Sequence, residues 1–322
     1  LFNCDFKKFI HFSKQNNGIG NIVVHPNSHP HDSDLVDFDE GFKINKIFNK
    51  PHKRKLLIRN NVSSAIYFLK KEILNFIPQN SSSDWMKDVF PNMLGELYAY
   101  RSSEFIYDVG TKKRINLARS FVNSKKYYLG SYANKRKAIF IDRDGVINKE
   151  VNGVYDQDQL EIIPQSDKAI KAINKSEYLA ICITNQPGVA KGFVTFDTMD
   201  LIHSKLDVGL GQRGAYLDDL YFCPHHPESG WPGEIKELKI QCNCRKPMPG
   251  MFLEAAAKHN LDLRNSYFIS DTLNDLKISE NIDIKTLLVN TGYGAKQDGS
   301  LSSGHLKAKN LYQAVKNILL QV

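Results

Sequence analysis

Residues 138–148 limit the possible folds of this chain more than any other stretch, and their sequence is AIFIDRDGVIN. A short apolar run that stops at an Asp-x-Asp-Gly turn is typical of a buried parallel strand. Such a strand would bring Asp142 and Asp144 to its carboxyl-terminal edge, where open α/β sheets bind ligands. Two carboxylates at this spacing can share a divalent cation. An ordinary turn is the alternative, because Asp and Gly are also common in turns for conformational reasons.

The composition indicates a folded protein with room for two domains. The chain has 322 residues, of which 42% are hydrophobic and 24% charged, as in ordinary globular proteins. Five cysteines, an odd number, argue against a disulfide framework. The net charge of +8 comes partly from short basic clusters at residues 53–55, 112–114 and 135–137. Clusters this short favour solvated surface over a nucleic-acid interface, so we expect no nucleic-acid partner.

The sequence contains no signal for a membrane or for export. No apolar run approaches the length that crosses a bilayer, and residues 1–5 lack the basic-then-apolar order of a signal peptide. We therefore expect no membrane partner and a cytoplasmic location. The chain begins with Leu1 rather than Met, so a fragment of a longer protein is one interpretation. The pattern does not indicate an oligomeric state.

Residues 1–125 are predicted to form a first domain of mixed α and β structure. Alternating apolar residues and turn signals predict strands at residues 21–25, 34–38, 42–48, 64–69 and 96–100. Apolar periodicity and capping residues predict helices at residues 70–77, 84–91 and 112–122. Ser83 and Asp84 can cap the second of these, and Thr111 caps the third.

Four segments of this domain resemble the later part of sugar-1-phosphate nucleotidyltransferases. They are residues 25–36 (HPNSHPHDSDLV), 49–52 (NKPH), 65–67 (AIY) and 107–111 (YDVGT). The resemblance implies that Lys50 contacts the sugar phosphate and that Asp108 helps to hold Mg²⁺. The glycine-rich nucleotide loop of that family has no counterpart in this sequence, so we expect no nucleotidyl transfer. The half is either a remnant or part of a truncated bifunctional chain.

Residues 126–136 are predicted to be a linker, and residues 137–322 a second domain. The linker is polar and basic with little apolar periodicity. Beyond it, strands at residues 179–183, 220–222, 267–270 and 286–289 alternate with helices at residues 165–175, 196–206, 250–259, 273–280 and 309–320. This alternation predicts a doubly wound α/β sheet.

Two further strands of this domain end in polar clusters. Thr184, Asn185 and Gln186 end one strand, and Asp271 and Asp275 follow another. Hydroxyl and amide groups at this edge can donate hydrogen bonds to phosphoryl oxygens, and a third carboxylate completes a site that suits Mg²⁺. A capped turn is the alternative for the first cluster. Asp275 either supports a neighbouring group or favours the dipole of the next helix.

Three cysteines and a histidine form two close pairs separated by a loop of fewer than twenty residues. These residues are Cys223, His225, Cys242 and Cys244. They fit a closed tetrahedral Zn²⁺ site of the Cys₃His type, although the spacing is Cys-x-His and Cys-x-Cys rather than Cys-x-x-Cys. Unrelated free thiols and a redox pair are the alternatives. With no open position, the zinc would be structural and would fold the loop that presents Arg245 and Lys246.

The order of these motifs resembles the haloacid-dehalogenase-like (HAD) phosphatases over residues 137–320. Within that family, the closest resemblance is to the zinc-containing branch that acts on D-glycero-D-manno-heptose 1,7-bisphosphate or histidinol phosphate. The resemblance implies a Rossmann-like fold with a minimal cap, since no domain-sized insertion follows residue 148. One departure is Thr272, where heptose phosphatases often carry Lys.

The resemblance also implies a role for each motif residue. Asp142 would be the nucleophile, Asp144 the general acid and then base, and Thr184 and Lys246 would stabilise the phosphoryl group. Mg²⁺ would bind Asp142, the backbone carbonyl of Asp144, and Asp271. The implied substrate-binding residues are Arg143, Asn185, Gln186 and Arg245, together with Lys50 of the first domain.

The sequence therefore predicts Mg²⁺-dependent hydrolysis of a phosphomonoester through an aspartyl-phosphate. A small phosphorylated sugar is the expected partner, and heptose 1,7-bisphosphate is preferred because the first domain resembles enzymes that use sugar 1-phosphates. Histidinol phosphate is the alternative substrate. The alternatives from other classes are a sugar-1-phosphate nucleotidyltransferase, if upstream sequence is missing, and a non-catalytic assembly protein.

Overall fold

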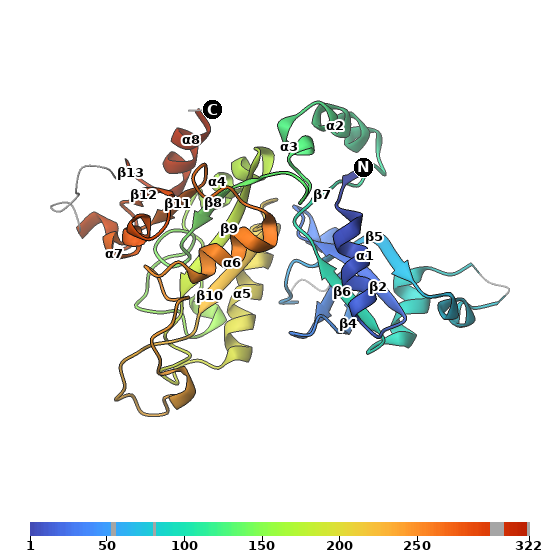
Figure 1. Cartoon of the computed structure of the whole chain (residues 1–322), viewed down its shortest axis with the longest axis horizontal. Coiled ribbons are helices and arrows are strands. Elements are labelled where there is room, and N and C mark those ends of the chain that lie inside the picture. Colours follow the sequence, from blue (N-terminus) through green and yellow to red (C-terminus); the bar gives the residue numbers. More distant parts are fainter. Residues whose placement is uncertain (53–55, 80–81, 297–305, 321–322) are drawn as a thin grey trace. The chain divides into compact units, whose positions relative to one another are not determined.

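The computed structural model describes residues 1–52, 56–79, 82–296 and 306–320. The basic cluster at residues 53–55 lies outside these ranges. The chain divides into two compact units, Leu1–Ser131 and Tyr132–Val322 (Figure 1). Among the described residues, none of the helices has both the length and the apolar character needed to cross a membrane.

The first unit contains a five-stranded sheet with the order β4-β3-β5-β2-β6. Its strands are β2 (Gly20–His25), β3 (Leu35–Phe38), β4 (Ile44–Phe48), β5 (Val62–Leu69) and β6 (Leu97–Arg101). The pair β2 and β6 is parallel, and the other pairs are antiparallel. A separate pair joins β1 (Phe2–Asn3) to β7 (Phe105–Ile106). All five strands expected in this unit are present, within two residues of their predicted bounds.

The helices of the first unit differ more from expectation. Helix α2 (Lys112–Val122) begins as predicted, with the Thr111 side chain accepting a hydrogen bond from the backbone N–H of Arg114. The run predicted at residues 70–77 is a 3-10 helix, Lys71–Phe76. The run predicted at 84–91 is a π-helix, Trp85–Val89, followed by a 3-10 helix, Phe90–Met93. Pro91 has no N–H to continue an α-helix there. Helices α1 (Phe6–Gln15) and α3 (Lys125–Tyr128) were not predicted.

The second unit is built on a six-stranded parallel sheet with the order β10-β9-β8-β11-β12-β13. Its strands are β8 (Lys137–Ile141), β9 (Tyr178–Asn185), β10 (Asp219–Cys223), β11 (Tyr267–Ser270), β12 (Lys285–Val289) and β13 (Leu306–Ala308). Strand β8 lies between β9 and β11, where the strand order reverses. In open α/β sheets, ligands bind at the carboxyl ends of the strands at such a reversal.

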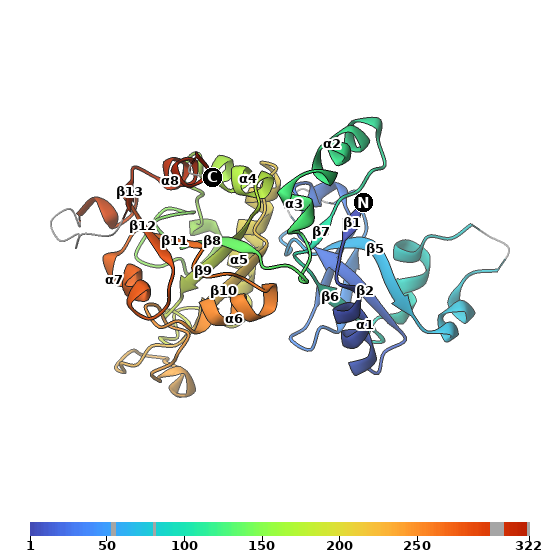
Figure 2. The ribbon, with the colours of Figure 1, turned by 45° about the horizontal axis from the view of Figure 1, so that its top comes forward.

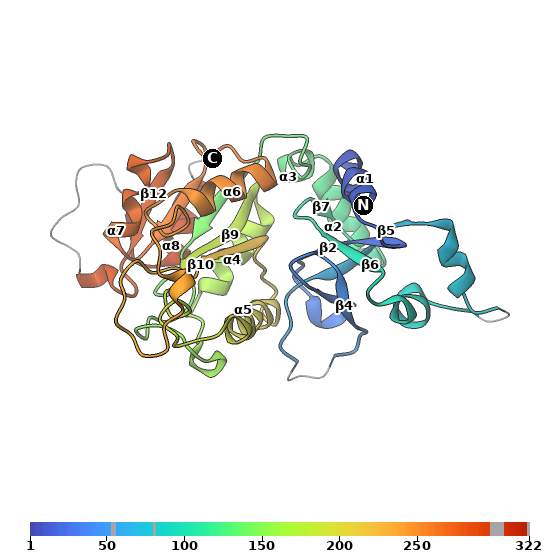
Figure 3. The ribbon, with the colours of Figure 1, turned by 60° about the horizontal axis from the view of Figure 1, so that its bottom comes forward.

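Helices cover both faces of this sheet, as the strand pattern predicted. They are α4 (Ser166–Lys175), α5 (Phe196–Gly211), α6 (Gly250–His259), α7 (Leu273–Leu276) and α8 (Leu311–Leu320). Ile139 and Ile141 of β8 pack with α4, α5 and α8, whereas Phe140 packs with α6 on the other face. Figure 2 shows α4 and α8 on one side of the sheet, and Figure 3 shows α6 beside β9 and β10 on the other. The predicted doubly wound α/β fold is confirmed.

Candidate functional site

Asp142 is the first residue after β8, and it is almost fully buried. Its backbone N–H donates to the carbonyl of Ile269 in β11 at 2.9 Å, which continues the sheet for one more residue. One carboxylate oxygen, Oδ1, accepts from the backbone N–H of Arg143 at 2.8 Å. The other, Oδ2, accepts from the Ser270 hydroxyl at 3.0 Å. These contacts hold the carboxylate at the carboxyl end of the central strand.

Lys246 forms ion pairs with two carboxylates at this point. Its Nζ lies 2.6 Å from Asp142 Oδ2 and 2.8 Å from Asp275 Oδ2, and 1% of its side chain is exposed. Burial favours the neutral amine, but the charges of Asp142 and Asp275 raise the pKa of Lys246 overall. Burial raises the pKa of Asp142 well above its ordinary value, despite the opposite effect of Lys246. The pKa of Asp275 is lowered, because Lys246 and hydrogen bonds outweigh the effect of burial.

Asp144 is held by donors on three neighbouring side chains. Nε and Nη2 of Arg143 donate to its Oδ1 at 3.1 Å and its Oδ2 at 2.9 Å. Asn148 donates to Oδ1 at 2.8 Å, and Gln186 donates to Oδ2 at 2.8 Å. Burial alone would raise the pKa of Asp144, but the Arg143 charge and these hydrogen bonds lower it overall. Asp144 is therefore fixed in orientation and ionised in the free chain.

The polar residues at the end of β9 join the carboxylates to Lys246. Gln186 Nε2 also donates to the Thr184 hydroxyl at 2.9 Å. The Asn185 side chain accepts from the backbone N–H of Lys246 at 3.0 Å and donates to its carbonyl at 3.1 Å. Asn185 thereby fixes the backbone from which the Lys246 side chain reaches Asp142.

Asp271 follows β11 and lies against two glycines. Its Oδ2 accepts from the backbone N–H of Tyr293 at 2.8 Å. A Cβ atom at Gly145 would lie 2.1 Å from this oxygen, and one at Gly292 would lie 2.0 Å from it. Both glycines have positive φ, so a side chain is disfavoured there by the backbone as well. Burial raises the pKa of Asp271 to about 6.

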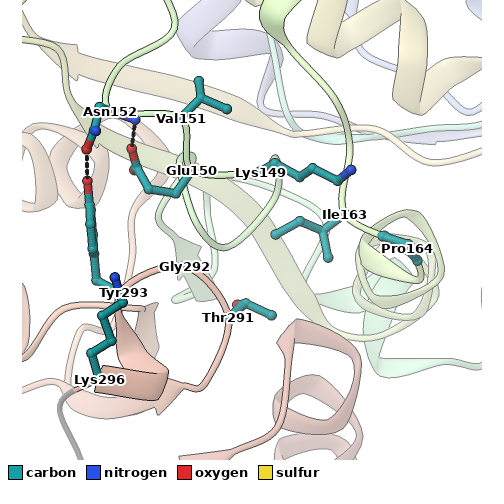
Figure 4. Close-up of a pocket in the computed structure, with 10 residues that line it drawn as sticks. All are labelled: Lys149, Glu150, Val151, Asn152, Ile163, Pro164, Thr291, Gly292, Tyr293 and Lys296. Carbon is teal, nitrogen blue, oxygen red and sulfur yellow. Dashed lines mark hydrogen bonds between the residues drawn. The ribbon is translucent and has the colours of Figure 1, made fainter.

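A cavity of about 620 Å³ opens beside Asp271. Three segments line it (Figure 4). The segment that follows the Asp-x-Asp motif contributes Lys149, Glu150, Val151 and Asn152, and the turn before α4 contributes Ile163 and Pro164. The loop after β12 contributes Thr291, Gly292, Tyr293 and Lys296. The Tyr293 hydroxyl donates to Asn152 Oδ1 at 2.7 Å, and this hydrogen bond joins two of the segments. The Tyr293 backbone contacts Asp271, so the cavity adjoins the cluster of carboxylates.

The Cys/His group comes together near the end of β10. The ligand atoms of Cys223, His225, Cys242 and Cys244 all lie within 4.8 Å of one another, so the group could hold a metal ion. The Sγ atoms of Cys244 and Cys223 are 3.1 Å apart, and those of Cys223 and Cys242 are 3.5 Å apart. His225 Nδ1 lies 3.2 Å from Cys244 Sγ. A tetrahedral Zn²⁺ site with ordinary Zn–S bonds has sulfur atoms about 3.8 Å apart, so only a small adjustment is needed.

The structure therefore brings most of the predicted site residues together in the second unit. Arg245 lies between Cys244 and Lys246, and its guanidinium is 3.5 Å from the His225 carbonyl. Lys50 belongs to the first unit, where its backbone N–H donates to Asp34 at 2.9 Å. Asp108, also in the first unit, pairs with Arg114.

Sequence reasoning missed four residues that complete the site. Ser270 and Asn148 bind the two carboxylates of the Asp-x-Asp motif, and Gly292 and Tyr293 enclose Asp271. The sequence around Gly292 carried a usable signal, because a Thr-Gly pair at the end of a predicted strand of this sheet marks a loop at the ligand edge.

Comparisons with known proteins match each half to a family. Residues 243–314 match the family described as HAD-hydrolase-like, and residues 1–125 match the family described as nucleotidyl transferase. A D-glycero-beta-D-manno-heptose-1,7-bisphosphate 7-phosphatase from Pasteurella multocida is 36% identical over 172 residues, which are 53% of this chain and 91% of that protein. The protein with the same name from Escherichia coli K12 is 36% identical over 157 residues, 48% of this chain and 80% of that protein.

A comparison with solved structures matches the chain to the same kind of phosphatase. The crystal structure of D,D-heptose 1,7-bisphosphate phosphatase from B. bronchiseptica, complexed with magnesium and phosphate, is 31% identical to this chain. The match has a TM-score of 0.51 and covers 58% of this chain and 99% of that one.

Proposed function

We propose that this chain, which belongs to the HAD-like phosphatase family, hydrolyses a phosphate ester of a heptose bisphosphate with the help of Mg²⁺. The observation that carries the proposal is the convergence of Asp142, Asp144, Asp271 and Lys246 at the carboxyl end of the central strand. The relatives with 36% identity, named as heptose bisphosphate 7-phosphatases, support the substrate.

The donor atoms at this edge fit a magnesium ion. Asp142, Asp271 and the backbone carbonyl of Asp144 offer oxygen ligands, which Mg²⁺ prefers. Burial disfavours ionised carboxylates at both Asp142 and Asp271, as their raised pKa values indicate. A bound cation would favour the ionised form of both. When bound, Mg²⁺ would neutralise charge on the phosphoryl oxygens and orient the phosphate.

In the first step, we infer that Asp142 attacks the phosphorus atom. A bond forms between its carboxylate oxygen and phosphorus, and the bond between phosphorus and the sugar oxygen breaks. Lys246 Nζ, 2.6 Å from Asp142, would stabilise the negative charge on the phosphoryl oxygens, together with the Thr184 hydroxyl. The departing sugar oxygen takes a proton from Asp144.

Asp144 must therefore be protonated when the substrate is bound. Its pKa is low in the free chain because of Arg143, but the negative charge of a bound phosphate would raise the pKa of a carboxyl group beside it. In the second step, Asp144 accepts a proton from the water that attacks the aspartyl-phosphate. That hydrolysis releases inorganic phosphate and restores Asp142.

We also propose that Cys223, His225, Cys242 and Cys244 bind a structural Zn²⁺. All four positions of a tetrahedral site are supplied by the chain, so no position is left for a substrate or water. The loop that follows Cys244 begins with Arg245 and Lys246. Zinc would therefore fix the segment from which Lys246 reaches Asp142.

The test is phosphate release with Mg²⁺ from heptose 1,7-bisphosphate and from histidinol phosphate, measured side by side. We expect a strong preference for the bisphosphate. Asp142→Asn is the matched control, because an amide cannot form the aspartyl-phosphate, and it should reduce turnover to background. A preference for histidinol phosphate would reject the substrate, and turnover retained by Asp142→Asn would reject the mechanism.

A further inference from the structure

One side-chain hydrogen bond joins the loop that follows the Asp-x-Asp motif to the loop after β12. The Tyr293 hydroxyl donates to Asn152 Oδ1 at 2.7 Å (Figure 4). The two residues are 141 positions apart in the sequence, and neither belongs to the motifs from which the site was predicted. The reaction steps proposed above use neither side chain.

Tyr293 contacts Asp271 through its backbone. Its N–H donates to Asp271 Oδ2 at 2.8 Å. The same oxygen would lie 2.1 Å from a Cβ atom at Gly145 and 2.0 Å from one at Gly292, so both glycine backbones approach it closely. Asp271 Oδ2 is therefore enclosed by backbone from two loops, and the Tyr293 N–H holds it by a hydrogen bond.

The loop that carries Tyr293 is shaped by bonds within itself. The Gly294 N–H donates to the Thr291 carbonyl, and the Lys296 N–H donates to the Tyr293 carbonyl, both at 3.0 Å. Tyr293 is 36% exposed, so packing in the core contributes little to fixing its ring. Burial first, and then the charge of Glu150, raises the pKa of Tyr293, so the hydroxyl keeps its proton and donates it in a hydrogen bond.

Asn152, the acceptor of that bond, is held in an unusual conformation by its own loop. Its φ of 61° lies in the left-handed region, which is disfavoured for most side chains and which Asn tolerates better than most. Its N–H donates to Glu150 Oε1 at 2.5 Å, and its carbonyl accepts from the Tyr155 hydroxyl at 3.3 Å. Residues held in sparsely populated conformations are common at functional sites.

Tyr155 fixes this loop to the body of the second unit. A Cβ atom at Gly188, in the loop after β9, would lie 2.6 Å from the Tyr155 ring. The same ring packs edge-on against Phe193, with the ring centroids 5.3 Å apart. The Tyr293 hydroxyl is therefore bonded to a segment that is itself held in place.

We propose that Tyr293 is a positioning residue for Asp271 as a magnesium ligand. Its hydroxyl, bonded to Asn152, would keep its backbone N–H on Asp271 Oδ2 before the cation binds. This inference rests on the proposed function, because it requires Mg²⁺ at Asp271. A carboxylate that is already oriented loses little freedom when a cation binds, whereas a loosely held one must be ordered at a cost in affinity.

The test is calorimetric titration of the full chain with Mg²⁺ alone, without substrate. Tyr293→Phe removes the hydroxyl and keeps both the ring and the backbone N–H. It should raise the Kd for Mg²⁺ by roughly threefold to tenfold, which corresponds to about 0.7–1.4 kcal/mol for a hydrogen bond between neutral groups. Tyr312→Phe is the matched control, because Tyr312 lies on α8 and is 38% exposed, and it should leave the Kd unchanged.

A double-mutant cycle separates positioning from a general loss of structure. Asn152→Gly removes the acceptor and introduces a residue that adopts positive φ readily, so it should raise the Kd for Mg²⁺ by at least the same factor. Tyr293→Phe should then have no further effect in the Asn152→Gly chain. Additive effects of the two substitutions would overturn the inference, because the hydroxyl would then act without Asn152.

Phosphate release from heptose 1,7-bisphosphate at increasing Mg²⁺ gives a second measurement. Tyr293→Phe should need more Mg²⁺ to reach half of its maximal rate, and its difference from the wild type should disappear at saturating Mg²⁺. An unchanged Kd for Mg²⁺, or a change only in the KM for the substrate, would overturn the inference and leave the phosphatase reaction intact. A wild-type chain that neither binds Mg²⁺ nor releases phosphate would reject the proposed function as well.

Discussion

Replacing Lys246 with Met should destabilise the second unit by about 3–5 kcal/mol at neutral pH without Mg²⁺. Its Nζ lies 2.6 Å from Asp142 and 2.8 Å from Asp275, and 1% of its side chain is exposed. At an effective dielectric constant of about 20, each pair contributes about 6 kcal/mol of attraction. Burial of the ammonium costs several kcal/mol and offsets much of this. The variant also leaves two buried carboxylates without their cation, which is the main reason for the expected loss.

The size of this loss should depend on Mg²⁺ and on pH. Magnesium bound to Asp142 would replace part of the missing positive charge, so saturating Mg²⁺ should reduce the difference between variant and wild type. Removal of Lys246 raises the pKa of Asp142 further, so the folded variant binds more protons than the folded wild type. The stability of the variant relative to wild type should therefore improve as the pH falls from about 8 to about 5.

Hydrogen exchange measured on peptides from β8 and β11 during urea titration would follow the second unit alone. Lys149→Met is the matched control. Its partner Glu161 is 2.7 Å away, but the two side chains are 50% and 65% exposed, so its loss should cost less than about 1 kcal/mol. If Lys246→Met costs no more than this control, the ion pairs of Lys246 do not carry the stability that we assign to them.

Three further outcomes can be measured separately. Metal analysis should find about one zinc per chain, and Cys244→Ser should lose it; a wild-type chain that folds fully without zinc would contradict the Cys₃His assignment. Gly292→Ala should weaken Mg²⁺ activation of phosphate release by roughly tenfold or more, because the new Cβ would lie 2.0 Å from Asp271 Oδ2. Gly233→Ala, at a positive φ with open space around it, is the control that should leave activation unchanged. His259 is buried and its pKa is lowered to about 4 from 6.5, by burial first. In the unfolded chain His259 has its ordinary pKa of 6.5, so it binds a proton more readily there than in the folded chain. The free energy of unfolding should therefore fall by up to about 3 kcal/mol as the pH drops from about 6.5 to 4. A His259→Gln variant that kept the same pH dependence in urea titrations would refute this.

Much of the second unit could be predicted because its signals are local. Apolar runs of four to eight residues, each followed by a polar cluster, are sufficient to recognise buried parallel strands and the ends at which ligands bind. Asp142, Thr184 and Asp271 were assigned to one edge in this way, and the structure has them there. The roles of the individual residues and the domain boundaries stay predictions.

Local signals were weaker in the first unit. The strands were recognised from alternation, but residues 71–76 and 85–93 form 3-10 and π-helices rather than α-helices. Apolar periodicity does not separate these helix types over one or two turns, since they differ in which carbonyl accepts each N–H.

The sequence by itself determined the order of strands β8 to β12 and of the helices between them, the Asp-x-Asp motif and the spacing of the Cys/His group. The tertiary structure decided which charged and polar side chains contact one another. The sequence is compatible with two roles for Asp275, and the structure places the Lys246 ammonium between Asp275 and Asp142. The Ser270 hydroxyl bonds Asp142 across 128 residues, and Asp271 lies against Gly145 and Gly292. Such contacts depend on how the strands are ordered across the sheet and on how closely the loops pack. Neither is encoded in the periodicity of any one segment.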